Sequence, residues 1–379
     1  MTDDALKDPD RLDGVAHPRE TAAVFGHAGA ERAFLSAWTE GRVHHAWLLC
    51  GPPGIGKASF AYRIARFVLS QREIDLSGFF AEPPPPPDSL DAEFDGPDAR
   101  QIAAGAHPGL KEIRRPFNAK TGKFGKVIAV DDIRALKNFF QLSAAEGGWR
   151  VALIDPADDL NIAAANALLK LLEEPPERCL FLLVSSAPGR LPPTILSRCR
   201  TLEFRPLSAA QARSAIAKAA DPAPEDVDAL LRLSPGSPGE ALRLDALGGA
   251  RLYGQVVELF TTLPEIDRRR LHMWLEEIRS ADALEGVGRL MRIAFERQAR
   301  AAALGPEAGL LDGPAEDALG ARLGPGAGPA RLWAEAATDT FERIDEALRL
   351  NLDPRRTILD TALHVEALLR PGFVAPQRG

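Results

Sequence analysis

Cysteine is scarce in this chain. Cys50, Cys179 and Cys199 are the only three among 379 residues, and they lie far apart without forming a motif. Three cysteines cannot make a four-cysteine zinc site, and this usage is typical of a reducing cytosol rather than of a disulfide scaffold. We therefore expect neither disulfides nor zinc.

Long apolar runs and an excess of positive charge are also missing. No run approaches the roughly 18 apolar residues of a membrane-spanning helix. The 46 Lys and Arg stand against 53 Asp and Glu, a net charge of −7, which is not the balance of a free-standing DNA-binding domain. The first residues are acidic and polar, unlike a signal peptide. These absences predict a cytoplasmic protein that does not bind a membrane.

One group of basic residues interrupts this acidic background. It comprises Arg114, Arg115, Lys120, Lys123 and Lys126. The group could form a local patch for nucleic acid, but a solvated, flexible loop is the simpler interpretation and the one that we adopt.

The remaining composition is that of an ordinary soluble protein, with 45% hydrophobic and 26% charged residues. The length allows two or three domains. Short apolar runs predict five strands, at residues 45–50, 127–130, 151–154, 180–184 and 201–204. Helical patterns lie between most of them. Strands that alternate with helices predict a parallel α/β sheet covered on both faces, in a domain that we place at residues 1–206.

The rest of the chain carries other patterns. We expect a loose arm at residues 1–20 and a proline-rich surface insertion without fixed structure at 71–108. Strand signals stop after Pro206, which predicts a small helical domain at 207–250 and a helical C-terminal domain at 251–372. A Gly/Pro-rich break interrupts the latter at 305–329. Two stripes predict buried helix faces: Trp333, Ala337, Phe341, Ile344 and Leu348, then Ile358, Ala362, Val365 and Leu369.

A glycine-rich loop follows the first predicted strand and opens a helix. Gly51, Gly54 and Gly56 have the spacing of a phosphate-binding loop, and Lys57 stands where a lysine would reach the terminal phosphates of a nucleotide. The alternative is an ordinary turn with an accidental lysine. The strand before the loop and the helix after it favour the phosphate loop.

Two parts that a nucleotide-hydrolysing site needs are missing. Ala58 occupies the position of the Ser or Thr whose hydroxyl holds Mg²⁺. Asp155 ends an apolar strand and could support a magnesium-bound water, but Pro156 follows it in place of a water-positioning Glu. Asp158 and Asp159 are best explained as solvated capping residues. We predict a vestigial site that binds ATP or ADP weakly or not at all, requires no cofactor and holds no metal.

Two longer motifs carry a family resemblance. One runs from Asp155-Pro156-Ala157-Asp158 through residues 161–170 to Leu172-Glu173-Glu174-Pro175-Pro176, and the other is residues 193–199, ending in Ser197-Arg198-Cys199. They resemble the clamp-loader branch of the AAA+ superfamily and, within it, the delta-prime subunits of bacterial DNA polymerase III. Asn351-Leu352-Asp353-Pro354-Arg355 is similar to the last helices of those subunits.

The resemblance implies an AAA+ P-loop α/β domain, a helical lid and an all-α collar that joins five subunits in a ring. It implies delta and gamma or tau subunits as partners, together with the sliding clamp and, through the assembly, primer-template DNA. A delta-prime subunit would be a non-hydrolysing stator. It would count as part of a DNA-directed DNA polymerase, a nucleotidyltransferase, only through membership of the holoenzyme.

Arg198 is the residue to which the resemblance assigns catalysis. In the family, this arginine reaches across the subunit interface to the ATP of a neighbour, and no residue of this chain would be catalytic in its own site. The alternative is a cation placed at a helix C-terminus to interact with its dipole. Ser197 and Cys199 would shape the corner rather than react, because no histidine is placed to activate Cys199.

The chain also departs from the family pattern. The proline-rich insertion stands where many relatives carry a four-cysteine zinc module. In the lid, Gly236-Ser237 is followed by Pro238-Gly239, without the sensor arginine of active relatives. Ser185 and Ser186 end a strand where relatives place a polar sensor, although a simple turn explains them equally well.

Two other functions remain open from the sequence. The intact Lys57 and Asp155 are compatible with a motor ATPase of the gamma or tau type. A free-standing DNA-binding protein is disfavoured by the net charge and by the absence of a basic motif.

Overall fold

The computed structural model describes residues 11–21, 23–71, 87–91, 96–118, 123–141, 148–220, 224–263, 265–276, 278, 281–305, 310–311 and 313–370. The chain divides into two compact units, residues 1–242 and residues 243–379, and each is described by itself. The three-domain division at residues 206 and 250 remains a prediction.

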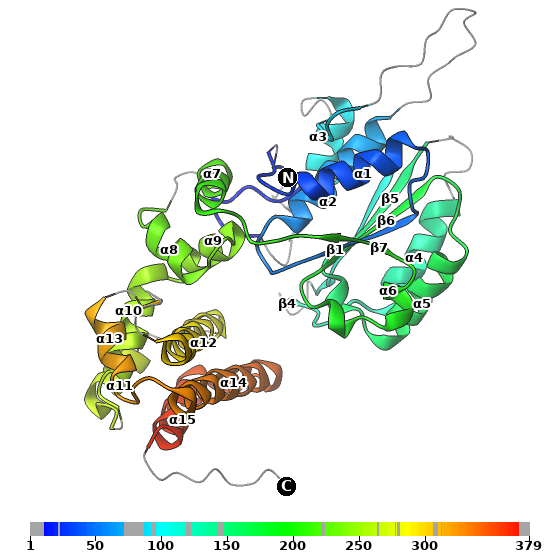
Figure 1. The fold of residues 1–379 in the computed structure, drawn as a ribbon. Coiled ribbons are helices and arrows are strands. Elements are labelled where there is room, and N and C mark those ends of the chain that lie inside the picture. Colours follow the sequence, from blue (N-terminus) through cyan, green and yellow to red (C-terminus); the bar gives the residue numbers. More distant parts are fainter. Residues whose placement is uncertain are drawn as a thin grey trace, which may run out of the picture. The chain divides into compact units, whose positions relative to one another are not determined.

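A parallel five-stranded sheet forms the centre of the first unit (Figure 1). Its strands are β1 (Ala46–Cys50), β2 (Leu110–Ile113), β5 (Arg150–Ile154), β6 (Cys179–Ser185) and β7 (Arg200–Glu203), in the order β2-β5-β6-β1-β7. A separate ribbon pairs β3 (Phe117–Asn118) with β4 (Lys123–Phe124). The expected α/β class is confirmed.

One of the five predicted strands was wrong. Residues 127–129 are a loop, and α4 (Val130–Gln141) begins where the predicted strand should end. The fifth strand is instead β2, which contains Lys111 and Glu112 and lies at the edge of the sheet. An edge strand is less buried than the central strands, so its sequence lacks the continuous apolar run that marks them.

Helices cover both faces of the sheet, because successive strand residues point to opposite sides. On one face, Trp47, Leu49 and their counterparts on β5 and β6 pack against α1 (Ala28–Thr39) and α2 (Lys57–Ser70). On the other face, Ala46 and Leu48 join a second core with α4 and α5 (Ile162–Glu173). Figure 1 shows these two layers around β1, β5 and β6.

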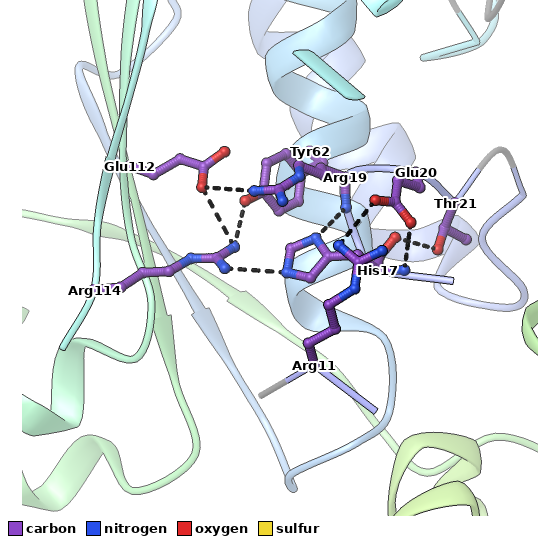
Figure 2. Close-up of polar contacts among 8 residues, drawn as sticks. All are labelled: Arg11, His17, Arg19, Glu20, Thr21, Tyr62, Glu112 and Arg114. Atoms are coloured by element: carbon purple, nitrogen blue, oxygen red, sulfur yellow. Dashed lines mark hydrogen bonds and ion pairs between the residues drawn. The ribbon is translucent and has the colours of Figure 1, made fainter. Parts of the chain in front are cut away.

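The predicted loose arm is, over residues 11–20, fastened to the sheet (Figure 2). The guanidinium of the buried Arg66 donates to the carbonyl oxygens of Arg19 at 3.2 Å and Thr21 at 2.9 Å. The buried His17 faces the guanidinium of Arg114 at 3.0 Å, and Arg114 also contacts Tyr62 on α2. Arg66 on α2 and Arg114 at the end of β2 therefore hold this segment in place.

In the basic group at 114–126, Lys126 is exposed in a bend, as expected, but Arg114 and Arg115 are not part of a solvated loop. Arg114 is 12% exposed and pairs with Glu112 at 3.6 Å, and Arg115 pairs with Asp159 at 3.3 Å. Lys120 lies outside the described residues, as does the side chain of Lys123. The two arginines serve the fold, because each is tied to a carboxylate of the same unit.

The predicted insertion is partly ordered. Helix α3 (Pro97–Ala103) buries Ala99 and Ile102, and Leu90 is buried in the core beside α1 and α2. Most of the proline run lies outside the described residues. The prediction of a segment without fixed structure was therefore wrong for residues 96–103.

Short helices follow the sheet, as expected after Pro206. The single-turn elements η1 (Ala157–Asp159), η2 (Pro188–Arg190) and α6 (Pro193–Leu196) lie between strands, and α7 (Ala209–Ala219), α8 (Val227–Leu233) and α9 (Pro238–Ala246) come after β7. Ser208 and Gln211 form a capping box that starts α7, in which each side chain accepts a backbone N–H of the other.

The second unit is helical throughout its described residues. Its helices are α10 (Gly249–Phe260), α11 (Arg268–Leu275), α12 (Ala281–Leu304), α13 (Pro314–Gly320), α14 (Ala327–Leu350) and α15 (Pro354–Leu368). The Gly/Pro-rich stretch at 305–329 contains α13, so it is not a simple break. Phe341 was wrongly predicted to be buried. Its side chain is 51% exposed, and the guanidinium of Arg292 lies 4.8 Å from its ring centre. Among the described helices of the chain, none has the length and apolar character to cross a membrane.

Candidate functional site

The predicted phosphate loop connects β1 to α2, as the sequence indicated. Gly51, Gly54 and Gly56 have backbone φ angles of 157°, 72° and 100°, which residues other than glycine rarely adopt. Space also requires Gly51, because a Cβ there would lie 2.5 Å from the carbonyl oxygen of Phe204. The glycines thus let the loop turn sharply from the strand into the first residue of α2.

Lys57 is buried in contacts with its own chain. Its ammonium donates to the carbonyl oxygens of Gly51 at 2.7 Å and Pro52 at 2.6 Å, and to Oγ of Ser186 at 2.9 Å. The side chain is 4% exposed. Burial lowers the pKa of Lys57 to about 8, against the opposing attraction of Asp155. A phosphate could reach this ammonium only by replacing those oxygens.

The start of α9 closes over the tip of the loop. The backbone N–H of Gly239 donates to the carbonyl oxygen of Gly54 at 2.8 Å, and Oγ of Ser237 donates to that of Pro53 at 2.8 Å. A Cβ on Gly239 would lie 2.9 Å from Cα of Gly54, and a Cβ on Gly54 would lie 2.5 Å from the backbone nitrogen of Glu240. The two glycines therefore permit backbone contact between the loop and the helix.

His27 contacts the loop from a third direction. This residue precedes α1, and its Nε2 lies 2.8 Å from the carbonyl oxygen of Ile55. Its ring packs on Phe204, and burial lowers its pKa. Carbonyl oxygens at all five positions from Gly51 to Ile55 are thus bonded by groups of the same unit.

The acidic residues near the loop have different partners. Asp158 accepts from Oγ of Ser185 at 2.5 Å and from the backbone N–H groups of Ser186 at 2.7 Å and Ala187 at 3.1 Å. It holds the end of β6 and does not cap α5, whose N-cap is Asn161. The interpretation of Asp158 as a solvated cap was therefore wrong. The same holds for Asp159, which pairs with Arg115.

Two positions that would support magnesium binding lack suitable side chains. Ala58 offers only a methyl group, and Pro156 offers no carboxylate beside Asp155. Among the described residues, no three His, Cys, Asp or Glu side chains are arranged to hold a metal ion. The absence of zinc remains a prediction.

Arg198 lies at the corner between α6 and β7. Its Nη2 is 2.8 Å from Oε1 of Glu173 at the end of α5, and its Nη1 donates to the carbonyl oxygen of Thr194 at 3.1 Å. The side chain is nevertheless 36% exposed. The guanidinium is therefore held on two sides while part of it still faces solvent.

The neighbours of Arg198 have structural roles. Oγ of Ser197 donates to the carbonyl oxygen of Thr194 at 3.1 Å. Burial raises the pKa of the Cys199 thiol to about 12, so it is protonated near neutral pH. A protonated thiol is a poor nucleophile, in agreement with the interpretation that Cys199 shapes the corner.

Lys57 and Arg198 lie at opposite ends of a strand pair. Strands β1 and β7 are parallel, with Trp47 beside Arg200 and Cys50 beside Glu203. The loop with Lys57 follows the carboxyl end of β1, whereas Arg198 precedes the amino end of β7. The structure does not bring the two predicted site residues together.

Several contacts of this site could not be anticipated from local patterns. Ser237 lies 184 positions from Pro53, and Glu173 lies in a motif whose sequence assigns it no role. The sequence is compatible with Ser186 as a polar sensor or as part of a turn, and its contact with Lys57 favours the sensor. The contact of His27 with the loop could not be predicted, because its residue type and spacing match no phosphate-loop pattern.

The family model and the curated relatives with which this chain was compared are subunits of DNA polymerase III. The model for "DNA polymerase III, delta subunit" matches residues 26–208. DNA polymerase III subunit delta' of Pseudomonas aeruginosa is 39% identical over 215 residues, which are 56% of this chain and 60% of that protein. The delta' subunit of Escherichia coli is 28% identical over 343 residues, 90% of this chain and 95% of that protein.

A curated tau subunit and a solved structure are also similar to this chain. The tau subunit of Escherichia coli is 32% identical over 244 residues, 63% of this chain but only 34% of that protein. A solved gamma subunit-related protein of Thermotoga maritima overlays with a TM-score of 0.44 at 15% identity, covering 89% of this chain and 100% of that one. Taken with the sheet order and the two sequence motifs, these matches support the assignment of this chain to the delta-prime/clamp-loader family of DNA polymerase III subunits.

Proposed function

We propose that this chain is a stator of the DNA polymerase III clamp loader, which does not hydrolyse ATP and donates Arg198 to the ATP of a neighbouring subunit. Its partners are then delta and gamma or tau subunits in a five-membered ring. Through that assembly it helps to place the sliding clamp on primer-template DNA in the cytoplasm.

The observation that carries this proposal is the separation of Lys57 from Arg198. The loop lies at the carboxyl end of the paired strands β1 and β7, and Arg198 lies at their amino end. An arginine so placed cannot serve the nucleotide loop of its own chain. Because its side chain is 36% exposed, it is available to a second molecule.

A guanidinium suits this task chemically. It stays charged at all physiological pH values and offers five N–H donors in a planar fork. Such a fork stabilises the charge that develops on a phosphoryl group in transfer. The neighbour would supply the magnesium, the attacking water and the nucleotide, and this chain would supply one cation.

The state of the phosphate loop supports the other half of the proposal. Ala58 and Pro156 remove a magnesium ligand and a water-positioning carboxylate, and Gly239 stands where active relatives carry an arginine. Lys57 is already bonded to three oxygens of its own chain. These residues do not fit a magnesium–nucleotide complex, so the chain requires no cofactor and binds ATP or ADP weakly at most.

A motor subunit of the gamma or tau type is the competing function. The 32% identity to the tau subunit of Escherichia coli favours it, as do Lys57 and Asp155. The two functions differ in what the isolated chain does. A motor turns over ATP by itself, whereas a stator does not.

The first test is ATP turnover by the purified chain with Mg²⁺, with and without primed DNA. We expect none above background. Turnover that rises with DNA and disappears in Lys57→Ala would establish the motor instead. The double variant Ala58→Thr, Pro156→Glu is a second check, because a site that lacks only these groups would gain activity from them.

The second test is the loader reconstituted with its gamma or tau subunits. Arg198→Ala should lower ATP turnover at the neighbouring site by at least about 100-fold, since arginine fingers contribute roughly 10³–10⁵. Arg190→Ala is the matched control, an exposed arginine of the η2 turn between β6 and α6. Equal turnover in the two variants would remove the trans role of Arg198.

A further inference from the structure

The Leu172-Glu173-Glu174-Pro175-Pro176 motif is not explained by the proposed function. Its two glutamates end α5, where Glu174 is the C-cap residue. Both are exposed, but they differ in their contacts. Oε1 of Glu173 lies 2.8 Å from Nη2 of Arg198.

The contact joins two segments that are fixed by the fold. Leu172, one residue before Glu173, is buried in the core under α4 and α5. Ile195, three residues before Arg198, is buried in the same core. The positions of both side chains are therefore set by packed helices, and the carboxylate meets the guanidinium at a defined place.

We propose that Glu173 is a positioning residue for Arg198: together with the carbonyl oxygen of Thr194, it fixes the guanidinium in the orientation in which it meets a phosphoryl group on a neighbouring subunit. This rests on the proposed function. It gives the first glutamate of the motif a role that the second does not share.

The geometry indicates that Glu173 orients the Arg198 guanidinium and does not withhold it from a ligand. Two contacts engage two of the five N–H donors, one on each terminal nitrogen. The remaining donors are enough for a bidentate contact with phosphate, and 36% of the side chain is exposed while it is held. An arginine that is fixed beforehand loses less conformational entropy when it binds, which lowers the barrier of the assisted step.

The test uses the reconstituted loader with Glu173→Gln and, as the matched control, Glu174→Gln. Exposed ion pairs hold side chains weakly, so Glu173→Gln should lower kcat about two- to fivefold with little change in KM. Glu173→Asp should restore part of the loss, and Glu174→Gln should have no effect. A rise in kcat in Glu173→Gln would mean that the carboxylate withholds the arginine, and it would overturn the proposal.

The Arg198→Ala background separates this proposal from the proposed function. If Arg198→Ala alone leaves turnover unchanged, the trans role fails. If Arg198→Ala lowers turnover and Glu173→Gln lowers it further in that background, the trans role stands and the positioning role fails. We expect no further loss in the double variant, because Glu173 acts only through Arg198.

A measurement on the isolated chain needs no partner. Arginine-directed dicarbonyl labelling, followed by mass spectrometry, reports how freely the Arg198 guanidinium moves. Glu173→Gln should speed labelling of Arg198 about two- to fivefold and leave labelling of Arg190 unchanged. Equal rates at Arg198 in both proteins would show that the pair does not hold in solution.

Discussion

The phosphate loop and the Arg198 corner differ in the direction of their contacts. At the loop, carbonyl oxygens of Gly51 to Ile55 and the ammonium of Lys57 are bonded within the same unit, and Lys57 is 4% exposed. At the corner, the fold holds Arg198 on two sides and leaves it 36% exposed. One region directs its cation inward and the other presents it outward.

The two regions therefore have different roles within one α/β domain, one in stability and one in binding. A buried lysine with three oxygen acceptors stabilises the loop, whereas an exposed arginine with two acceptors remains free to bind a third. Both regions lie in short sequence motifs, residues 51–58 and 193–199. What distinguishes them is the set of partners that the fold supplies.

The largest expected effect comes from placing a methyl group on a glycine of the closed loop. Gly54→Ala should lower the free energy of unfolding by about 3 kcal/mol or more, because the Cβ would lie 2.5 Å from the backbone nitrogen of Glu240 and φ is 72°. Gly189→Ala, in the exposed η2 turn, has open space within 4 Å and should stay within about 0.5 kcal/mol. Urea unfolding measures both. Similar values would mean that the phosphate loop is no more tightly closed than an open turn.

The pH dependence of stability tests the inward lysine. The pKa of Lys57 is lowered from 10.5 to about 8 by burial. Between these values the unfolded chain holds a proton that the folded chain has released, so stability rises with pH through this window. The rise should reach about 3 kcal/mol at most and should disappear in Lys57→Met. A wild-type curve that is parallel to that of Lys57→Met from pH 8 to 10.5 would place the ammonium in solvent.

His17, in the same unit, gives a smaller effect. Burial, followed by the charges of Arg114, Arg19 and Arg11, lowers its pKa from 6.5 to about 3. Below pH 6.5 the unfolded chain takes up a proton that the folded chain does not. The free energy of unfolding therefore decreases as the pH is lowered. Between pH 6.5 and 5 the loss should be about 2 kcal/mol and absent in His17→Gln. His272→Gln, at an exposed histidine of the second unit, should leave the loss in place.

Local patterns predicted the parts of the site that are local. The phosphate loop lies within eight residues between a strand and a helix, and Arg198 lies in a seven-residue motif, so both could be placed from the sequence. Four strands of the sheet were predicted for the same reason: β1, β5 and β6 have continuous apolar runs, and the pattern at β7 alternates. The edge strand β2 was missed because Lys111 and Glu112 interrupt its apolar pattern.

Contacts between distant segments could not be predicted in this way. Gly239 was noted only as a missing arginine, whereas the structure shows its backbone N–H bonded to Gly54. Residues 11–20 were expected to be loose because nothing in their own sequence indicates a partner. The arginines that hold them come from α2 and from the end of β2. Spacing along one chain carries no information about which surfaces meet, so these partners required the folded structure.

The smallest expected effect is at Cys199, beside Arg198. Cys199→Ala should change ATP turnover of the reconstituted loader less than twofold, because burial raises the thiol pKa to about 12 and the group has no part in the chemistry. Its half-buried side chain packs with the core under α5 and α6, so a small loss of stability is expected instead. Turnover is compared with Arg198→Ala at the same subunit ratio. If Cys199→Ala lowered ATP turnover nearly as much as Arg198→Ala, the exposed charge would not be what distinguishes this corner from the loop. The function would then depend on the geometry of the whole turn.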